Sequence, residues 1–339
     1  MLKSEFTAVI KETQLLLKNN SGWRGRWVDY AKQISDKKPI IDSVRKSFRE
    51  RPPLMVYLNI TSAKTANKSV NFELRYKGQI VAELTGNIDG RHKLSTEGTK
   101  SYKENNKDHF GCDIPLEKAE WDGKDAAKFR SFFKHRRGVR NVDADRSNDE
   151  HRLESLLLTE FSIVKNKKTR NIRPVRFGSV RFPMPTPIIA SNHKNPQYPQ
   201  YGKRDKGGGI DILARTGKGG KATHLCIMEL KDENTRREPP KDAMKQAVAY
   251  TTFIRELLRS DAGEAWWKLF GFGGGGKVPK PLVLYAACVM RSNLNNDYSF
   301  RDMELEIEED TIKLHYLYFT EENDRIKIKP EETTLAVVD

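Results

Sequence analysis

The chain has few of the residues that build disulfide frameworks, zinc sites or membrane spans. Its 339 residues include three scattered cysteines and seven dispersed histidines. Three cysteines cannot all pair, and neither residue type recurs at the spacing of a zinc site, so we expect a reducing compartment and no structural zinc. The sequence contains no run of eighteen apolar residues and no apolar leader. We therefore expect a soluble, cytoplasmic protein without a membrane partner.

Positive charge is what the chain has in excess. It carries 61 Lys and Arg against 46 Asp and Glu, a formal net charge of +15. This excess favours a polyanionic partner, with nucleic acid ahead of a membrane surface. One basic cluster runs along a predicted helix over 124–135 and into the polar segment after it. It comprises Lys128, Arg130, Lys134, Arg136, Arg137 and Arg140. We interpret this cluster as a phosphate clamp, and a solvated surface is the alternative.

The most informative stretch is an apolar segment around Asp211, followed eighteen residues later by Glu229 and then by Lys231. Residues two apart on a strand share a face, so Glu229 and Lys231 point the same way while Leu230 points to the other side. The glycine-rich turn 216–220 predicts a hairpin that brings Asp211 alongside Glu229. Two carboxylates and an ammonium on one sheet edge suit a hard cation that faces phosphate, whereas the acid-x-lysine triplet alone would indicate only a charged strand end.

Two predicted helices flank this hairpin in the sequence. Residues 151–161 form an amphipathic pattern with Glu154 among leucines that face the core. A second helix starts after the prolines at 239–240 and carries Gln246 and Tyr250 four residues apart, on one helical face. The order is therefore helix with acid, strand with acid, strand with acid-x-lysine, and helix with Gln-x-x-x-Tyr.

That order resembles the PD-(D/E)XK nuclease superfamily over roughly residues 150–259, and the Gln-x-x-x-Tyr element is similar to that of its RecB-like branch. Ile210 stands where the name of the motif has proline. The resemblance implies an α/β fold, the restriction-endonuclease-like mixed sheet flanked by helices. It also implies metal-dependent hydrolysis of phosphodiester bonds to 5′-phosphate and 3′-hydroxyl ends.

The same resemblance implies a role for each motif residue. The implied ligands of Mg²⁺, which Mn²⁺ would replace, are Asp211, Glu229 and the backbone carbonyl of Leu230. The residues it places in catalysis are Lys231, Glu154, Gln246 and Tyr250. The lysine would orient the attacking water and offset charge in the transition state, and the helix acid would hold water or a second ion. The Gln-x-x-x-Tyr pair would position the lysine or the DNA strand.

The first part of the chain has a pattern of its own. Its predicted elements are helices over 4–17, 22–34 and 38–50, a strand over 54–60, a hairpin over 72–84, a polar loop over 86–110 and a linker over 136–149. We predict an N-terminal α+β recognition or regulatory domain over 1–145 and a nuclease domain over 146–339. Further strands are predicted over 281–290, 303–307, 312–319 and 325–328.

The sequence thus favours a DNA endonuclease of restriction or phage defence. A repair or recombination exonuclease of the RecB-like branch and a non-catalytic nucleic-acid-binding protein are the alternatives. DNA is the expected partner, contacted also by Lys218 and Lys221 of the hairpin turn, and RNA, a homodimer and a defence-system partner stay open. The glycine-rich segment 271–277 is no ATP site, because Val278 replaces the required Ser or Thr.

Overall fold

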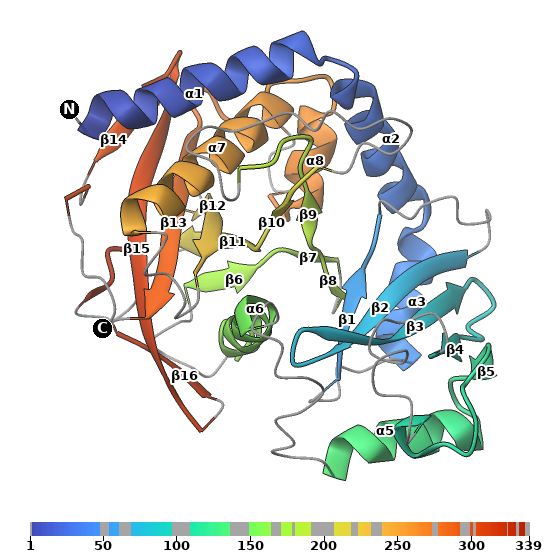
Figure 1. Ribbon diagram of the computed structural model, residues 1–339. Coiled ribbons are helices and arrows are strands. Elements are labelled where there is room, and N and C mark those ends of the chain that lie inside the picture. The colour runs from blue at the N-terminus through green and yellow to red at the C-terminus, as the bar shows by residue number, and fades with distance from the viewer. Residues whose placement is uncertain are drawn as a thin grey trace. The chain divides into compact units, whose positions relative to one another are not determined.

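The computed structural model of the chain is a mixed α/β protein, as the sequence predicts (Figure 1). It describes residues 2–47, 54–60, 69–96, 109–135, 149–163, 171–177, 180–190, 207–217, 223–231, 239–272, 277–291, 299–300, 303–323, 325–329 and 332–335. Contacts between Cα atoms divide the chain into two compact units. Unit 1 comprises residues 1–31, 156–175 and 183–339, and unit 2 comprises residues 32–155 and 176–182.

Unit 1 is built on a mixed sheet with the strand order β14-β15-β13-β12-β11-β6, and β16 also pairs with β15. Its strands are β6 (Ile172–Pro174), β11 (Ile212–Gly217), β12 (Thr223–Leu230), β13 (Val283–Arg291), β14 (Glu304–Ile307), β15 (Asp310–Glu322) and β16 (Arg325–Ile328). Strands β12, β13 and β15 run parallel, and the other neighbours are antiparallel. The parallel strands are largely apolar, as expected for strands that are buried on both faces. A separate two-stranded sheet pairs β9 (Met184–Pro185) with β10 (Gly209–Ile210).

Helix α7 (Pro240–Leu258) packs against β12 and β13 of this sheet and is buried over most of its length. It begins with Pro240 in its first turn, where a missing N–H breaks no helical hydrogen bond. Helix α1 (Leu2–Asn19) packs along α7, and α8 (Gly263–Leu269) follows it (Figure 1). At the start of α2 (Trp23–Asp36), Trp23 and Trp27 make edge contacts with Phe253 of α7, at 5.5 and 5.3 Å between ring centroids. None of the described helices is long and apolar enough to cross a membrane.

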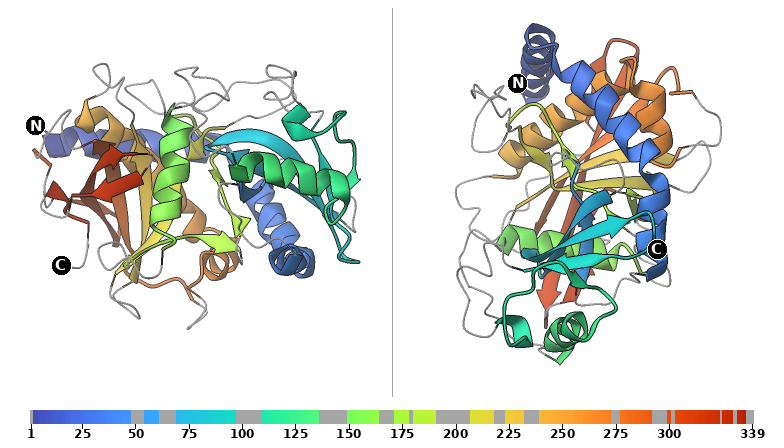
Figure 2. Two further views of the ribbon diagram at one scale, coloured as in Figure 1. Left: turned by 90° about the horizontal axis from the view of Figure 1, so that it is seen from below. Right: turned by 90° about the vertical axis from the view of Figure 1, so that its right-hand side faces the viewer.

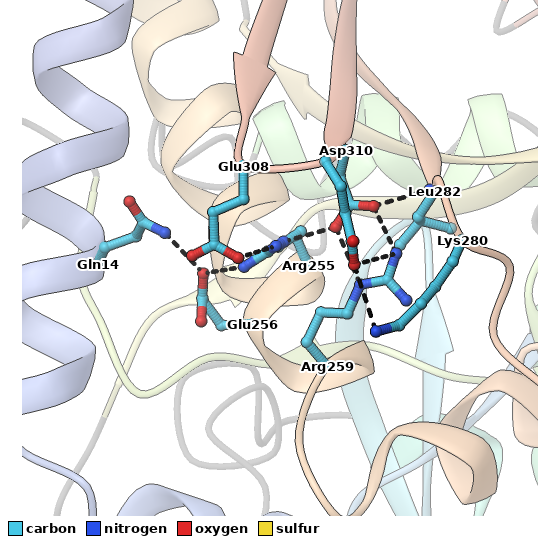
Figure 3. Close-up of polar contacts among 9 residues, drawn as sticks. Gln14, Arg255, Glu256, Arg259, Lys280, Leu282, Glu308 and Asp310 are labelled. Atoms are coloured by element: carbon cyan, nitrogen blue, oxygen red, sulfur yellow. Dashed lines mark hydrogen bonds and ion pairs between the residues drawn. The ribbon is translucent and has the colours of Figure 1, made fainter.

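A charged network fastens the C-terminal half of α7 to the sheet (Figure 3). Asp310, the first residue of β15, is 2% exposed. Its carboxylate accepts hydrogen bonds from Arg255 Nε at 2.8 Å, from Nε and Nη2 of Arg259, and from the backbone N–H of Leu282 at 2.8 Å. Arg255 also donates to Glu308, at 2.7 Å. One carboxylate therefore joins the helix, the start of β15 and the residue before β13.

Unit 2 contains a second sheet, with the strand order β5-β4-β3-β2-β1-β8-β7. Its strands are β1 (Leu54–Leu58), β2 (Ser69–Tyr76), β3 (Gln79–Asn87), β4 (Lys93–Ser95), β5 (Ala119–Glu120), β7 (Arg176–Phe177) and β8 (Val180–Arg181). Its helical segments are the rest of α2, α3 (Lys38–Ser47), the short 3₁₀ turn His109–Gly111, α5 (Lys124–His135) and the start of α6 (Asp149–Glu160). Alternate residues of β2 are buried. Helix α5 contacts this buried side through Phe133, whose ring centroid lies 5.0 Å from that of Tyr76. Figure 2 shows α5 beside the curved β2–β3 hairpin.

The two compact units do not follow the predicted boundary at residue 145. Residues 1–31 belong to unit 1, because the apolar side of α1 and the tryptophans of α2 pack on partners more than 200 residues later in the chain. Phe6, for example, makes an edge contact with Phe300, with 5.8 Å between the ring centroids. The predicted loop 86–110 contains the short strand β4. Of the predicted linker 136–149, only Asp149 is described, and it begins α6.

Candidate active site

Asp211 lies where the chain passes from the small sheet of unit 1 to the large one. It separates β10, which pairs with β9, from β11, which pairs with β12 and β6. In the β11–β12 register Ile212 is opposite Met228, and one further step places Asp211 opposite Glu229. Opposite residues of an antiparallel pair lie on the same face of a sheet, so both carboxylates belong to one face.

Glu229 and Lys231 form a buried ion pair beside this position. Lys231 Nζ donates to Glu229 Oε1 at 2.9 Å, and the two side chains are only 8% and 5% exposed. The pair confirms that both side chains leave the strand on one face, as the two-residue period requires. Removing two charges from water costs several kcal/mol per ion, which the attraction within the pair offsets only with good geometry and further hydrogen bonds. A buried ion pair with a second carboxylate beside it therefore contributes little to the stability of the fold.

The backbone of Leu230 fixes the Asp211 carboxylate. Its N–H donates to Asp211 Oδ2 at 2.8 Å. On the other edge of the chain, the N–H of Lys231 donates to the carbonyl of Val289 in β13. The N–H and C=O of one strand residue point to the same edge, so the Leu230 carbonyl opens on the side where Asp211 lies.

Gln246 and Tyr250 of α7 are both buried, at 3% exposure each. The Tyr250 hydroxyl accepts a hydrogen bond from the backbone N–H of Ala190 at 3.3 Å. Burial and the neighbouring Glu229 carboxylate raise the pKa of Tyr250 far above its ordinary value, so its hydroxyl keeps its proton at neutral pH. The charges of Asp211 and Lys231 also act on this hydroxyl. One turn earlier, Gln246 Oε1 is buried and accepts no hydrogen bond from the described residues.

Glycine at position 208 allows the chain to pass close to Tyr250. A Cβ on Gly208 would lie 2.6 Å from the Tyr250 hydroxyl oxygen and 2.9 Å from the carbonyl oxygen of Ile188. The backbone there is held by hydrogen bonds from Gly208 N–H to Ile188 and from Thr186 N–H to Gly208. Sequence reasoning did not include this segment in the site. The three consecutive glycines just before Ile210 were the available signal.

Glu154, the predicted helix acid, belongs to unit 2 and is 7% exposed. His151 Nδ1, one turn earlier on α6, lies 3.5 Å from Glu154 Oε2. This hydrogen bond raises the pKa of His151 above its ordinary value. In the same unit, the buried Arg181 donates to the hydroxyl of Tyr57 at 3.1 Å and to the carbonyl of Ser155 at 3.3 Å.

Of the residues predicted to contact nucleic acid, Lys134 is described, and it is exposed near the end of α5. Those that lie outside the described residues are Arg136, Arg137, Arg140, Lys218 and Lys221.

The donor atoms around Asp211 suit a hard cation. They are the carboxylates of Asp211 and Glu229 and the carbonyl of Leu230, all of which are oxygen donors. Over the part of the chain that the structure describes, no three His, Cys, Asp or Glu side chains gather as ligands. Such a small set fits Mg²⁺, which keeps several waters and is commonly held by one or two carboxylates together with substrate phosphates.

Comparison with family models, with curated proteins and with solved structures gives no match.

Proposed function

We propose that the chain is a metal-dependent nuclease that hydrolyses phosphodiester bonds of DNA, with a restriction-endonuclease-like core in unit 1. The observation that carries the proposal is the arrangement of Asp211 opposite Glu229, with Lys231 bonded to Glu229 on the same buried face. A fold that needed only stability would have little use for three ionisable groups packed there, because apolar residues of similar volume are often as stabilising. The net charge of +15 supports a polyanionic substrate.

The carboxylates of Asp211 and Glu229, with the Leu230 carbonyl, would hold Mg²⁺. Bound there, the cation would polarise a phosphoryl oxygen and lower the pKa of water. Lys231 would present its ammonium to the attacking water and to the charge that develops on the phosphate. Its three N–H donors allow it to keep Glu229 while it contacts the substrate.

The two residues of α7 have different roles in this proposal. Tyr250 keeps its proton and holds the backbone at Ala190, so it would position the segment that leads to Asp211 and would not act as an acid or base. Gln246 Oε1 is a buried acceptor, and a hydrogen bond to it would offset the free-energy cost of its burial. Lys231 or a substrate-bound water would supply the donor. Glu154 is assigned to the same reaction by the sequence motif alone.

Two other functions remain as alternatives. A repair or recombination exonuclease of the RecB-like branch would use the same residues, and the Gln-x-x-x-Tyr spacing favours it. A non-catalytic nucleic-acid-binding protein would need only the positive charge, and the Asp211, Glu229 and Lys231 cluster argues against it.

The decisive experiment incubates supercoiled plasmid with the protein in Mg²⁺ or in EDTA. We expect cleavage in Mg²⁺ only, and a linear substrate with blocked ends separates endonuclease from exonuclease. Asp211→Asn and Glu229→Gln should each lower the rate by at least about 10²-fold, as expected for loss of a ligand that stabilises the transition state. The matched control is Glu304→Gln, which removes an exposed carboxylate of the same unit and should cleave normally. Cleavage by either site variant within tenfold of the wild-type rate would exclude the assignment.

A further inference from the structure

Two arginines of unit 1 face each other across neighbouring strands. Arg173 of β6 is directly opposite Arg215 of β11 in an antiparallel pair. Opposite residues have Cβ atoms about 5 Å apart, and like charges in that position are destabilising. Each side chain is partly buried. Burial and the charge of Arg173 together lower the pKa of Arg215.

No described carboxylate compensates this pair. Among the ion pairs of the described residues, none involves Arg173 or Arg215. The nearest hydrogen bonds go to backbone carbonyls, from Arg173 Nη1 to Ile172 at 3.4 Å and from Arg215 Nη1 to Gly271 at 2.8 Å. The sequence around the pair is also free of acids, because neither 162–204 nor 212–228 contains Asp or Glu. Strands β6 and β11 thus place two positive charges together without a carboxylate partner among the described residues.

Residues that follow α8 and a tryptophan of α8 hold the guanidinium of Arg215 in place. It lies over the ring of Phe272, 5.9 Å from its centroid, and Phe272 stacks on Trp267 at 3.9 Å. Gly271 has a positive φ of 88°, and a Cβ there would lie 2.7 Å from Arg215 Nη1, so glycine gives the guanidinium its room. Arg215 Nε is buried and has no acceptor among the described residues. The side chain as a whole is only partly buried, so a guanidinium fixed in this way can present its other N–H donors to a phosphate.

The pair lies on the same sheet face as the candidate active site. Arg215 is opposite Leu225, and Leu225 shares its face with Glu229, four residues further along β12. Four residues of strand span about 13 Å. Phosphates of one DNA strand succeed each other by about 3.4 Å along the helix axis. The arginines therefore lie at a distance of a few nucleotides from Asp211 and Glu229.

We propose that Arg173 and Arg215 form a phosphate-binding subsite for the nucleic-acid strand, a few nucleotides from the reacting phosphate. The assignment of this subsite to the reaction rests on the proposed nuclease function. It explains why the chain keeps two like charges opposite each other. The repulsion is relieved when a phosphate lies between them, and it is a stability cost in its absence.

The test measures binding and stability separately. A fluorescent DNA duplex is titrated with Arg173→Gln, Arg215→Gln and the double variant in EDTA, between about 50 and 200 mM salt. Each single variant should lower the slope of log affinity against log salt by about 0.9, and weaken binding about eightfold at 0.1 M salt. Arg215→Lys keeps the charge, so its slope of log affinity against log salt should stay close to that of the wild type. The control Lys327→Gln removes one cation of an exposed ion pair and should change the slope much less.

Stability supplies the second readout. Removing one of two repelling charges should leave the melting temperature of Arg173→Gln unchanged or raised, although binding is weaker. A lowered melting temperature with an unchanged salt slope would overturn the proposal and give the pair a structural role. A free nucleoside 5′-phosphate that binds as tightly as the duplex would also overturn the strand assignment, as would a wild-type protein that binds no DNA.

The outcome is independent of catalysis. If the protein binds DNA through this pair and does not cleave in Mg²⁺, the proposed subsite stands and the proposed nuclease function is refuted. A protein that cleaves while the arginine variants bind like wild type would refute the subsite alone.

Discussion

Asp310 is the acceptor at the centre of the charged network on α7, and removing it tests how unit 1 is held together. Asp310→Ala deletes four hydrogen bonds and leaves the guanidinium groups of Arg255 and Arg259, 3% and 13% exposed, without that carboxylate. Breaking a buried ion pair by removing one partner costs about 3–5 kcal/mol. Arg255 keeps its bond to Glu308, so we expect a loss near the lower end, about 3 kcal/mol.

A unit of roughly 200 residues loses about 2–4 °C of melting temperature per kcal/mol, so the expected fall is about 6–12 °C. Calorimetry gives the melting temperature, and urea unfolding gives the free energy of unfolding. The matched control is Glu309→Ala at the neighbouring position, where the carboxylate is 51% exposed and 3.4 Å from Lys280. Exposed pairs of this kind contribute less than about 1 kcal/mol.

The pH dependence supplies a second test of the same residue. Burial alone would raise the pKa of Asp310, but hydrogen bonds from Arg259, Leu282 and Arg255 hold it below its ordinary value. A depressed folded-state pKa gives stability that is complete above the unfolded value of about 4 and is lost as the pH falls through the folded value. Wild type should therefore lose stability in acid more steeply than Asp310→Ala. Parallel pH profiles, or a variant as stable as the Glu309 control at neutral pH, would refute the reasoning.

Three further results are expected. Lys231→Ala should abolish Mg²⁺-dependent cleavage while isothermal titration still detects Mn²⁺ binding, because an ammonium is not a metal ligand; lost Mn²⁺ binding would indicate a structural lysine. Tyr250→Phe removes one buried hydrogen bond, so it should destabilise unit 1 by about 1 kcal/mol. It should also speed amide exchange at Ala190 and slow cleavage, and an unchanged exchange rate would contradict the positioning role. A fragment that starts at Asp145 lacks α1 and the start of α2, which pack on α7, and should be insoluble or molten by circular dichroism; a cooperatively folded fragment would refute this view.

The local geometry of the hairpin could be read from the sequence because strand periodicity is a short-range rule. Alternation by two residues placed Glu229 and Lys231 on one face, and the glycine-rich turn set the direction of pairing. The register that puts Asp211 opposite Glu229 is not fixed by alternation alone, because a shift of two residues would keep every side chain on the same face. Most helices and strands were also predictable, since their apolar residues recur with the period of each element.

The long-range contacts could not be read in this way. The amphipathic pattern of α1 shows that the helix needs a partner, but nothing local identifies α7 as that partner, and the predicted boundary at 145 missed it. The bond between Tyr250 and Ala190 joins residues that are sixty positions apart. The opposition of Arg173 and Arg215 depends on how β6 pairs with β11, and β6 is too short for a periodic signal.

The docking of α1 on α7 has a consequence for how the protein is made. Helix α1 ends at Asn19, and α7 begins at Pro240. At about 5–20 residues per second, a ribosome finishes the first helix roughly 10–45 s before it starts the helix that covers it. Throughout that interval the apolar side of α1, including Phe6 and Ile10, lacks its native cover. In unit 1 the first helix is therefore made long before its partner, and its apolar side is open to chaperones and to aggregation while the chain is still growing.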